Sequence, residues 1–286
     1  MKITIVNACC DLGVKVNGSD EGPLALNMYQ DKVDNVLTVK KENVIKELEE
    51  GNKRRNIKPL NRFNEELYNT IKDNNDFIIT IGGDHSIAIG SDLASKKKHG
   101  DIGIFWIDAH SDYHNMDSTI SGNIHGMPFA TIDGENGNEL SYFFDGEYFD
   151  PKKSVLIGGR DIEDPEYINL EKAGVKIYTT DDIKKYGVKK IMDDAYEIVK
   201  DASGLHISFD LDVIDPEIAP GVSVKAVNGI NEEEAYEIVK EIINKKELLK
   251  SFDLVEFNPS LDIDNKTKNI AINILNQIIE TKKSEL

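Results

Sequence analysis

Three short segments of this chain contribute two histidines and four of their aspartates with types and spacings that suit a pair of metal ions. The segments read GGDHS (82–86), DAHSD (108–112) and SFDLD (208–212), and each follows or ends an apolar run typical of a buried strand. Because alternate side chains of a strand point to the same face, a spacing of two residues aims the polar groups of a segment in one direction. The candidate ligands are His85, Asp108, His110, Asp112, Asp210 and Asp212.

The chemistry of these six side chains narrows the choice of metal. All are nitrogen or oxygen donors, which favours Mn(II), with Fe(II), Co(II) and Zn(II) as competitors, over a structural cysteine–zinc site. Four carboxylates brought together repel one another unless cations neutralise them, and two divalent ions balance four negative charges. Two neighbouring ions can share a bridging water and lower its pKa, which provides hydroxide at neutral pH. Any one segment alone could be a helix cap or a turn; three together predict a dinuclear metal centre.

The rest of the chain alternates between apolar runs and helix-like stretches. The apolar runs lie at residues 3–8, 35–39, 77–82, 102–108, 154–159, 176–180, 206–212 and 252–257, and the helix-like stretches include 61–72, 86–97, 188–200, 232–244 and 267–282. Most of the runs are rich in Ile and Val with little alternation, as in strands covered on both faces. This order predicts a parallel sheet between two helical layers. Open α/β sheets carry their sites at the carboxyl ends of strands, where all three ligand segments fall.

Composition excludes several classes of protein. The chain has 286 residues, of which 40% are hydrophobic, so we expect residues 1–286 to form one domain. The net charge of −18 and the lack of a concentrated basic region argue against nucleic-acid binding. No segment approaches the roughly 18 to 20 apolar residues of a membrane span, and the first residues resemble a strand more than a signal peptide. The adjacent Cys9 and Cys10 fit reduced core residues of a cytoplasmic protein.

The ligand segments, in this order, resemble those of the ureohydrolases, the superfamily of arginases and agmatinases. Four further segments carry the likeness: VNGSDEGPLAL (16–26), SGNIHGMP (121–128), GGRDIEDPE (158–166) and VEFNPSLD (255–262). The resemblance covers nearly the whole chain and is strongest to bacterial arginases. It implies the three-layer α/β/α arginase fold with an eight-stranded parallel sheet, and a homotrimer or homohexamer.

The resemblance also implies how two Mn²⁺ ions share the six ligands. One ion would be held by His85, Asp108, Asp112 and Asp210, and the other by Asp108, His110, Asp210 and Asp212. Asp108 and Asp210 would therefore bridge the two ions.

The implied reaction is hydrolysis of the guanidinium of L-arginine to L-ornithine and urea, by attack of a metal-bridging hydroxide. Glu256 matches the carboxylate that pairs with the guanidinium and places its carbon for attack. Asp112 would accept a hydrogen bond from the hydroxide and pass its proton to the leaving nitrogen. His125 would move protons between the site and solvent, a role that suits a pKa near neutrality.

The remaining candidate residues would bind the amino-acid end of the substrate. By the same resemblance, Ser121 and Asn123 would donate hydrogen bonds to the α-carboxylate. Glu163 stands where arginases usually carry an aspartate near the α-amine, and Asp161 and Glu166 would support it. Acidic side chains there favour a substrate with an ammonium group at that end.

Three positions depart from the arginase pattern. His114 stands in place of an asparagine that helps to hold the α-carboxylate, although a histidine can also donate to a carboxylate. Val224 stands in place of a threonine near the guanidinium, and Lys225 in place of a proline. The loop that holds them, residues 219–229, is more like that of formimidoylglutamases, which lack the SGNxHG segment present here.

These departures leave two alternatives open. The chain could be another ureohydrolase, such as an agmatinase, a guanidinobutyrase or a formimidoylglutamase. It could also be a family member without hydrolase activity that binds metal or ligand for regulation or assembly. The presence of all six ligands together with Glu256 argues against the second alternative.

Overall fold

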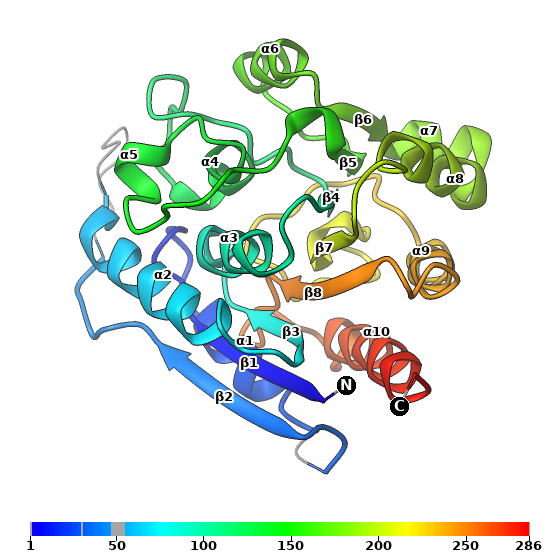
Figure 1. Cartoon of the computed structure of the whole chain (residues 1–286), viewed down its shortest axis with the longest axis horizontal. Helices are drawn as coiled ribbons and strands as arrows, with labels where there is room; N and C mark the ends of the chain where they lie inside the picture. Colours follow the sequence, from blue (N-terminus) through cyan, green and yellow to red (C-terminus); the bar gives the residue numbers. More distant parts are fainter. Residues whose placement is uncertain (1, 30, 47–54, 286) are drawn as a thin grey trace.

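The computed structural model describes residues 2–29, 31–46 and 55–285. Eight strands form one sheet in the order β2-β1-β3-β8-β7-β4-β5-β6, and every pairing between neighbouring strands is parallel (Figure 1). The strands are β1 (Ile3–Cys9), β2 (Asn35–Lys40), β3 (Phe77–Gly82), β4 (Gly103–Ile107), β5 (Ser154–Gly159), β6 (Lys176–Thr179), β7 (Leu205–Asp210) and β8 (Leu249–Val255).

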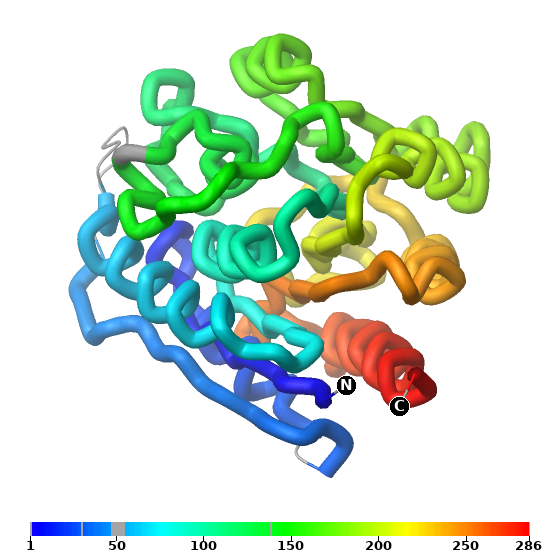
Figure 2. The backbone as a smooth tube through the Cα atoms, in the orientation of Figure 1, coloured from blue at the N-terminus to red at the C-terminus, as the bar shows by residue number. Residues whose placement is uncertain are grey.

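Helices cover both faces of this sheet (Figure 1). One layer contains α2 (Ile57–Ile71), α3 (Ala88–His99), α4 (Pro128–Ile132), α5 (Gly137–Leu140) and α6 (Asp164–Ala173). The other contains α1 (Gly22–Ala25), α7 (Thr180–Tyr186), α8 (Val188–Ile198), α9 (Glu232–Ile243) and α10 (Lys266–Lys283). Figure 2 traces the chain through these layers, from β1 at the N-terminus to α10 at the C-terminus. The predicted three-layer fold with an eight-stranded parallel sheet is confirmed.

The apolar strands build two cores because their side chains alternate between the faces of the sheet. In β4, Phe105 and Ile107 pack into the core under α8, α9 and α10, whereas Ile104 and Trp106 pack under α2 and α3. These four side chains have no solvent exposure. Full burial of such a side chain contributes about 1.5–3 kcal/mol to the free energy of unfolding. Central strands of this kind therefore hold the carboxyl ends of the sheet rigidly in place.

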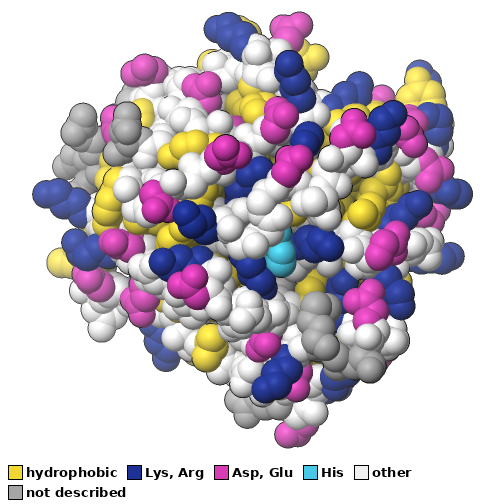
Figure 3. Space-filling view, in the orientation of Figure 1, with side chains coloured by type: hydrophobic (Ala, Val, Ile, Leu, Met, Phe, Trp, Pro, Cys, Tyr) yellow, Lys and Arg dark blue, Asp and Glu magenta, His cyan; other side chains and the backbone are white. Residues whose placement is uncertain are grey.

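The surface is strongly charged but mixed. Figure 3 shows acidic and basic side chains interspersed over the face in view. No helix within the described ranges combines the length and the apolar character that crossing a bilayer requires. Cys9 and Cys10 are both buried and unbridged, as the sequence predicts.

The strands end earlier than predicted at two of the three ligand segments. β4 ends at Ile107, before Asp108, and β7 ends at Asp210, after which Leu211–Val213 form a 3₁₀ turn. Alternation along a strand therefore does not aim the polar side chains of residues 108–112 or 210–212, and that part of the prediction is wrong. Turns beyond the strand ends position these side chains instead.

Candidate metal and substrate site

The six candidate ligands meet at the carboxyl edge of the sheet. β4 and β7 are neighbours, and β8 lies between β7 and β3, so the segments that leave these four strands are adjacent in space. The turn after β3 carries His85, and Glu256 follows β8. The segment after β4 carries Asp108 and Asp112, whereas Asp210 ends β7 and Asp212 lies in the turn after it. Parallel pairing places all these strand ends at one edge, which is why distant parts of the sequence converge there.

His85 is surrounded by three carboxylates. Its Nδ1 lies 3.0 Å from Asp108 Oδ2, 3.2 Å from Asp112 Oδ2 and 3.0 Å from Asp210 Oδ2. In spite of these short separations, Nδ1 forms no hydrogen bond. A ring nitrogen that faces several carboxylate oxygens without bonding to any of them suits a shared metal ion.

The His85 ring is held from its other side. Its Nε2 shares a hydrogen bond of 2.9 Å with Ser208 Oγ, and the ring stacks on Trp106 with centroids 4.0 Å apart. Trp106 also donates its Nε1–H to Asp108 Oδ2 at 2.9 Å. These contacts leave Nδ1 as the ligand atom and fix its direction, as outer contacts of metal-binding histidines do.

A second group adjoins the first through Asp108. His110 Nδ1 lies 2.9 Å from Asp212 Oδ2 and 3.6 Å from Asp108 Oδ1. Asp108 thus turns one oxygen toward His85 and the other toward His110, which is the arrangement of a bridging carboxylate. Asp210 Oδ1 accepts a hydrogen bond of 2.7 Å from the backbone N–H of Asp212, so its Oδ2 is directed toward His85.

Burial makes the negative charge of this centre costly. The four aspartates are at most 5% exposed. Burial, with the nearby charge of Asp108, raises the pKa of Asp112 to about 7. Burial alone would lower the pKa of His85 and of His110, but the surrounding carboxylates raise both well above the usual range. Without cations the centre therefore holds protons that a pair of divalent ions would displace, so the donor set fits a dinuclear metal site.

Asp112 and Glu256 both have left-handed backbone conformations, with φ values of 49° and 67°. Such conformations cost non-glycine residues about 1–3 kcal/mol and persist only where surrounding contacts impose them. Glu256 donates its backbone N–H to Gly83 O at 2.8 Å, and Asp112 O accepts from Ala130 N–H at 3.3 Å. The surrounding contacts therefore hold both residues in a strained conformation, which is typical of functional sites.

Glu256 connects the candidate ligand His85 to His125. Its Oε1 accepts a hydrogen bond of 2.9 Å from the His85 backbone N–H and lies 3.3 Å from His125 Nδ1. Its Oε2 is buried and forms no hydrogen bond. Burial would lower the pKa of His125, but the hydrogen bond with Glu256 raises it. The unpaired Oε2 is an acceptor that is available to a donor from a ligand or from water.

A cavity of about 210 Å³ opens beside this centre. All six predicted substrate-binding residues line it, namely His114, Ser121, Asn123, Asp161, Glu163 and Glu166. His110, Asp112, His125 and Val224 also face the cavity, so it joins the candidate metal ligands to the candidate substrate residues.

Comparison with known proteins agrees with this geometry. The model of the Arginase family matches residues 1–280. The chain belongs to the arginase family. It is 32% identical over 292 residues to an arginase of Staphylococcus aureus (strain COL), with 96% of this chain and 95% of that protein covered. Family membership makes it a hydrolase of guanidino carbon–nitrogen bonds, as the sequence predicts.

Solved structures of the arginase family superpose closely. The arginase of Entamoeba histolytica in complex with L-ornithine has a TM-score of 0.90 and 29% identity, and covers 97% of this chain and 98% of that one. The arginase of Bacillus caldovelox has a TM-score of 0.89 and 30% identity, with 98% of both chains covered. The family implies a dinuclear metal site, for which the two groups around Asp108 offer the donors.

The acidic residues of the cavity differ in how they are held. Glu163 and Glu166 form the capping box at the start of α6, and Glu166 Oε1 also accepts from Ser111 Oγ at 2.6 Å. His114 Nε2 lies 3.4 Å from Glu163 Oε2 and 3.6 Å from Glu166 Oε2. The Asp161 side chain is 65% exposed. Glu163 and Asp161 are thus open to a ligand, whereas Glu166 mainly holds the loops together.

Two arginines that support the site were not predicted from the sequence. Arg55 donates to Ser121 O and, at 2.6 Å, to Asn123 Oδ1. Arg160 donates to Asp212 O at 2.8 Å and to Ala226 O at 2.9 Å, which joins a candidate ligand to the loop of Val224. Arg160 lies inside a segment that carries the resemblance, whereas no motif marks Arg55, 66 residues before Ser121.

Proposed function

We propose that this protein hydrolyses the guanidinium of L-arginine to L-ornithine and urea at a dinuclear manganese centre. One observation carries the proposal: the buried, unpaired Glu256 Oε2 lies in the carboxylate that also contacts a candidate metal ligand, His85, and His125. A guanidinium supplies the N–H donors that this oxygen lacks. Such a group bound at Glu256 would sit beside the metal centre.

The proposed metal ligands follow the two groups described above. His85, Asp108, Asp112 and Asp210 would hold one ion, and Asp108, His110, Asp210 and Asp212 the other. Nitrogen and oxygen donors suit Mn²⁺, while Fe²⁺, Co²⁺ and Zn²⁺ could use the same set. When bound, two such ions would activate a water molecule for attack on the guanidinium carbon.

Glu256 would orient the substrate. Its Oε1 is fixed by the His85 backbone N–H, and the left-handed backbone sets the direction of the side chain. A guanidinium N–H bonded to Oε2 would therefore have a defined position relative to the aspartates. Alignment of this kind lowers the barrier because the reacting atoms need not search for their geometry.

Asp112 and His125 would move the protons. Asp112 Oδ2 lies 3.2 Å from His85 Nδ1 and the side chain lines the cavity, so its carboxylate would accept a proton from the attacking water and pass it to the leaving nitrogen. His125 contacts Glu256 and lines the cavity, which supports a role between the proposed guanidinium site and solvent. It can deliver a proton to the departing amine or return one to bulk water.

The outer end of the cavity would select an amino acid. Asn123 Oδ1 accepts from Arg55, which leaves the amide nitrogen to donate to an α-carboxylate. Ser121 would donate its hydroxyl to the same group. Glu163, with Asp161 beside the cavity, would accept hydrogen bonds from an α-ammonium. Arginine carries both groups, whereas agmatine lacks the carboxylate.

Val224 and His114 favour one second candidate, a ureohydrolase for a related guanidine or amidine. Val224 gives the cavity wall an apolar group that cannot hydrogen-bond to a guanidinium. His114 offers a bulkier donor than an asparagine at the carboxylate end. A pocket with these two residues could suit a substrate of different length or charge.

A substrate panel with manganese-loaded protein tests both candidates. We expect urea and ornithine in equal amounts from L-arginine. Agmatine, 4-guanidinobutyrate and formimidoylglutamate are the competitors, and turnover of any of these without turnover of arginine would contradict the leading proposal. We also propose that residues 1–286 act as one catalytic domain, because all eight strands join one sheet. The resemblance to arginases supports a homotrimer or homohexamer. Light scattering tests the assembly, and a monomer would contradict it.

A further inference from the structure

A second buried group of histidine and carboxylates lies beneath α3, outside the site described above. His206 comes from β7, Asp253 from β8 and Asp92 from the middle of α3. His206 Nε2 is 3.0 Å from Asp92 Oδ1 and 3.9 Å from Asp253 Oδ2. The three ligand-type atoms all lie within 4.8 Å of one another, and each side chain is at most 1% exposed.

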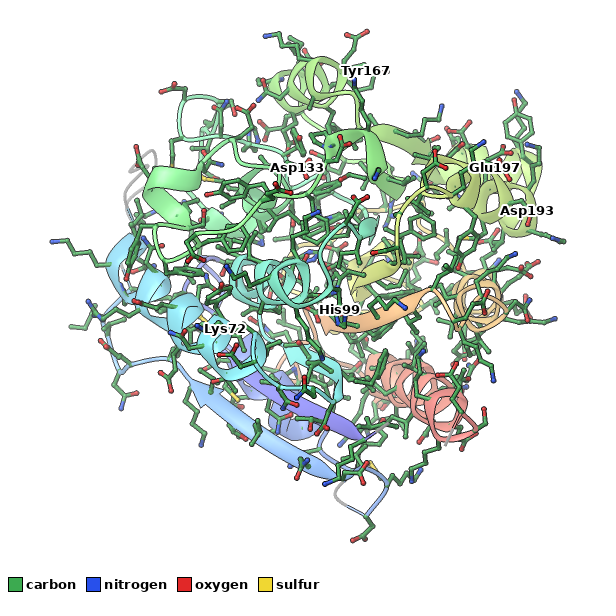
Figure 4. The ribbon with its side chains drawn as sticks, viewed as in Figure 1. Lys72, His99, Asp133, Tyr167, Asp193 and Glu197 are labelled. Carbon is green, nitrogen blue, oxygen red and sulfur yellow. The ribbon has the colours of Figure 1, made fainter. Side chains whose placement is uncertain are left out.

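The fold brings these residues together by register. β7 and β8 pair with His206 opposite Ser251 and Ser208 opposite Asp253. α3 lies over these strands on the face of the sheet that it shares with α2 (Figure 1). Figure 4 labels His99, the last residue of α3, and Asp92 lies two turns before it in the helix. Two strands and one helix thus each contribute one donor to the group.

The direction of the His206 ring is determined by a serine. Its Nδ1 shares a hydrogen bond of 2.7 Å with Ser251 Oγ, which is itself bonded to Ser95 Oγ. The opposite nitrogen, Nε2, faces Asp92 and Asp253 but forms no hydrogen bond. Asp92 Oδ2 is also buried without a hydrogen-bond partner. His206 Nε2 is therefore an unpaired polar atom that faces two buried carboxylates, and one of these carboxylates, Asp92, has an unpaired oxygen of its own.

The catalytic centre shows the same pattern around His85. There too one ring nitrogen is bonded to a serine of β7, Ser208, while the other lies 3.0–3.2 Å from carboxylate oxygens without a hydrogen bond. At His85 this arrangement fits a metal ligand of the arginase family. The parallel at His206 points to the same chemistry.

The separations suit coordination. With metal–ligand bonds of about 2.1 Å, separations of 3.0 and 3.9 Å from His206 Nε2 correspond to angles of about 90° and 135° at an ion. Ser91 Oγ lies within hydrogen-bond distance of Asp92 Oδ1, at 3.2 Å, and of Asp253 Oδ2, so this oxygen adjoins both carboxylates of the group. No position in this group is open to solvent, which is typical of a structural metal site.

Charge leads to the same conclusion. Among the described residues no lysine or arginine pairs with Asp92 or Asp253, so without a metal ion protons must balance the charge of the group. Burial would lower the pKa of His206, but the two carboxylates raise it, and burial raises the pKa of Asp253 to about 7. One divalent ion bound by the two carboxylates would take the place of these protons.

We propose that His206, Asp92 and Asp253 bind a third divalent metal ion of the zinc or manganese class. The ion would be structural and would fasten α3 to β7 and β8. Because the turn before α3 carries His85, this link would also stiffen the support of the catalytic centre. The site is independent of the proposed substrate.

Metal content per chain tests the proposal. The whole protein is produced in medium that contains both manganese and zinc, and ions are counted by mass spectrometry. We expect three ions per wild-type chain, and one fewer in the Asp92→Asn and His206→Gln variants. The matched control is Asp133→Asn, at a position labelled in Figure 4. The Asp133 carboxyl group accepts a hydrogen bond from Tyr113 OH and belongs to neither metal group. It should retain three.

Two results would overturn the proposal: a wild-type chain with only two ions, or variants whose ion count equals that of the wild type. Either result would leave the group as a proton-sharing network. If the variants fail to fold, anomalous diffraction from wild-type crystals at the zinc and manganese edges decides the question. A peak between α3 and the β7–β8 pair is expected, and no peak there would refute the site. Protein with this peak but without turnover of arginine would support this site while contradicting the proposed function.

Discussion

Replacement of Glu256 by glutamine removes one negative charge at the proposed guanidinium site and keeps the size of the side chain. In the wild-type protein Oε1 is occupied by the His85 backbone N–H, and Oε2 has no partner. In Glu256→Gln the amide oxygen would accept from that N–H, which turns the amide NH₂ toward the guanidinium donors. The variant would thus lose an acceptor and place donor against donor.

The size of the effect follows from the strength of a charge-assisted hydrogen bond. Loss of such a bond costs about 1.5–3 kcal/mol, which corresponds to roughly 10- to 150-fold in kcat/KM. The donor–donor contact adds to this loss, so we expect a decrease of about 10²-fold or more for L-arginine. Metal content should not change, because Glu256 is not among the proposed ligands.

Urea formation by manganese-loaded wild-type and variant proteins provides the assay, with metal content measured on the same samples. Glu171→Gln, at an exposed position of α6, is the matched control and should have wild-type activity. A Glu256→Gln variant with kcat/KM within about threefold of the wild type would refute the role given to this carboxylate. A variant that loses metal would also refute the reasoning, because the side chain would then support the centre and not the substrate.

Three further predictions follow from the site and its surroundings. Asp210→Ala or His110→Ala should abolish turnover and lower metal occupancy, and full activity of either variant would refute the dinuclear centre. His125→Ala should slow turnover by about 10²-fold if this residue moves protons; an unchanged rate would exclude that role. Burial raises the pKa of Asp133 to about 8, above its value in the unfolded chain. The folded protein therefore binds this proton more tightly than the unfolded chain, and the resulting stabilisation is lost as pH rises toward 8. Asp133→Asn should therefore gain thermal stability relative to the wild type from pH 5 to pH 8, and a constant difference in Tm would contradict the shift.

The strands were predictable from the sequence because a parallel sheet buried on both faces leaves long apolar runs. α6 and α7 were not, because they bury little apolar surface. In α6 only Glu166 and Leu170 are buried, and in α7 only Thr180 and Ile183. Neither helix leaves the periodic apolar pattern by which a sequence reveals a helix.

The six candidate metal ligands meet in the structure, as their segments suggest, but their geometry was not predictable. Alternation along a strand suggested a common direction, whereas Asp112 reaches the centre through a left-handed turn and Asp212 through a 3₁₀ turn. Turn conformation beyond a strand end depends on tertiary contacts, such as the bond from Ala130 N–H to Asp112 O. The contacts of Arg55 and Arg160 were not predictable either, because their partners are carbonyl and amide groups far away in the sequence.

His206 shows a further limit of sequence analysis. It begins the apolar run 206–212, and a histidine in such a run is most simply interpreted as a core residue with satisfied hydrogen bonds. Burial is confirmed, but Nε2 has no hydrogen-bond partner. The carboxylates that face it come from α3 and β8, and no spacing in the sequence connects them.

The ratio of kcat/KM for L-arginine to that for agmatine, measured on manganese-loaded protein, tests the central claim most directly. Both substrates present the same guanidinium to Glu256, and only arginine carries the carboxylate that Asn123 and Ser121 would bind. A site that leaves polar groups unpaired with the smaller substrate discriminates strongly, so we expect a ratio above about 10². A ratio below one, or no urea from arginine, would contradict the account.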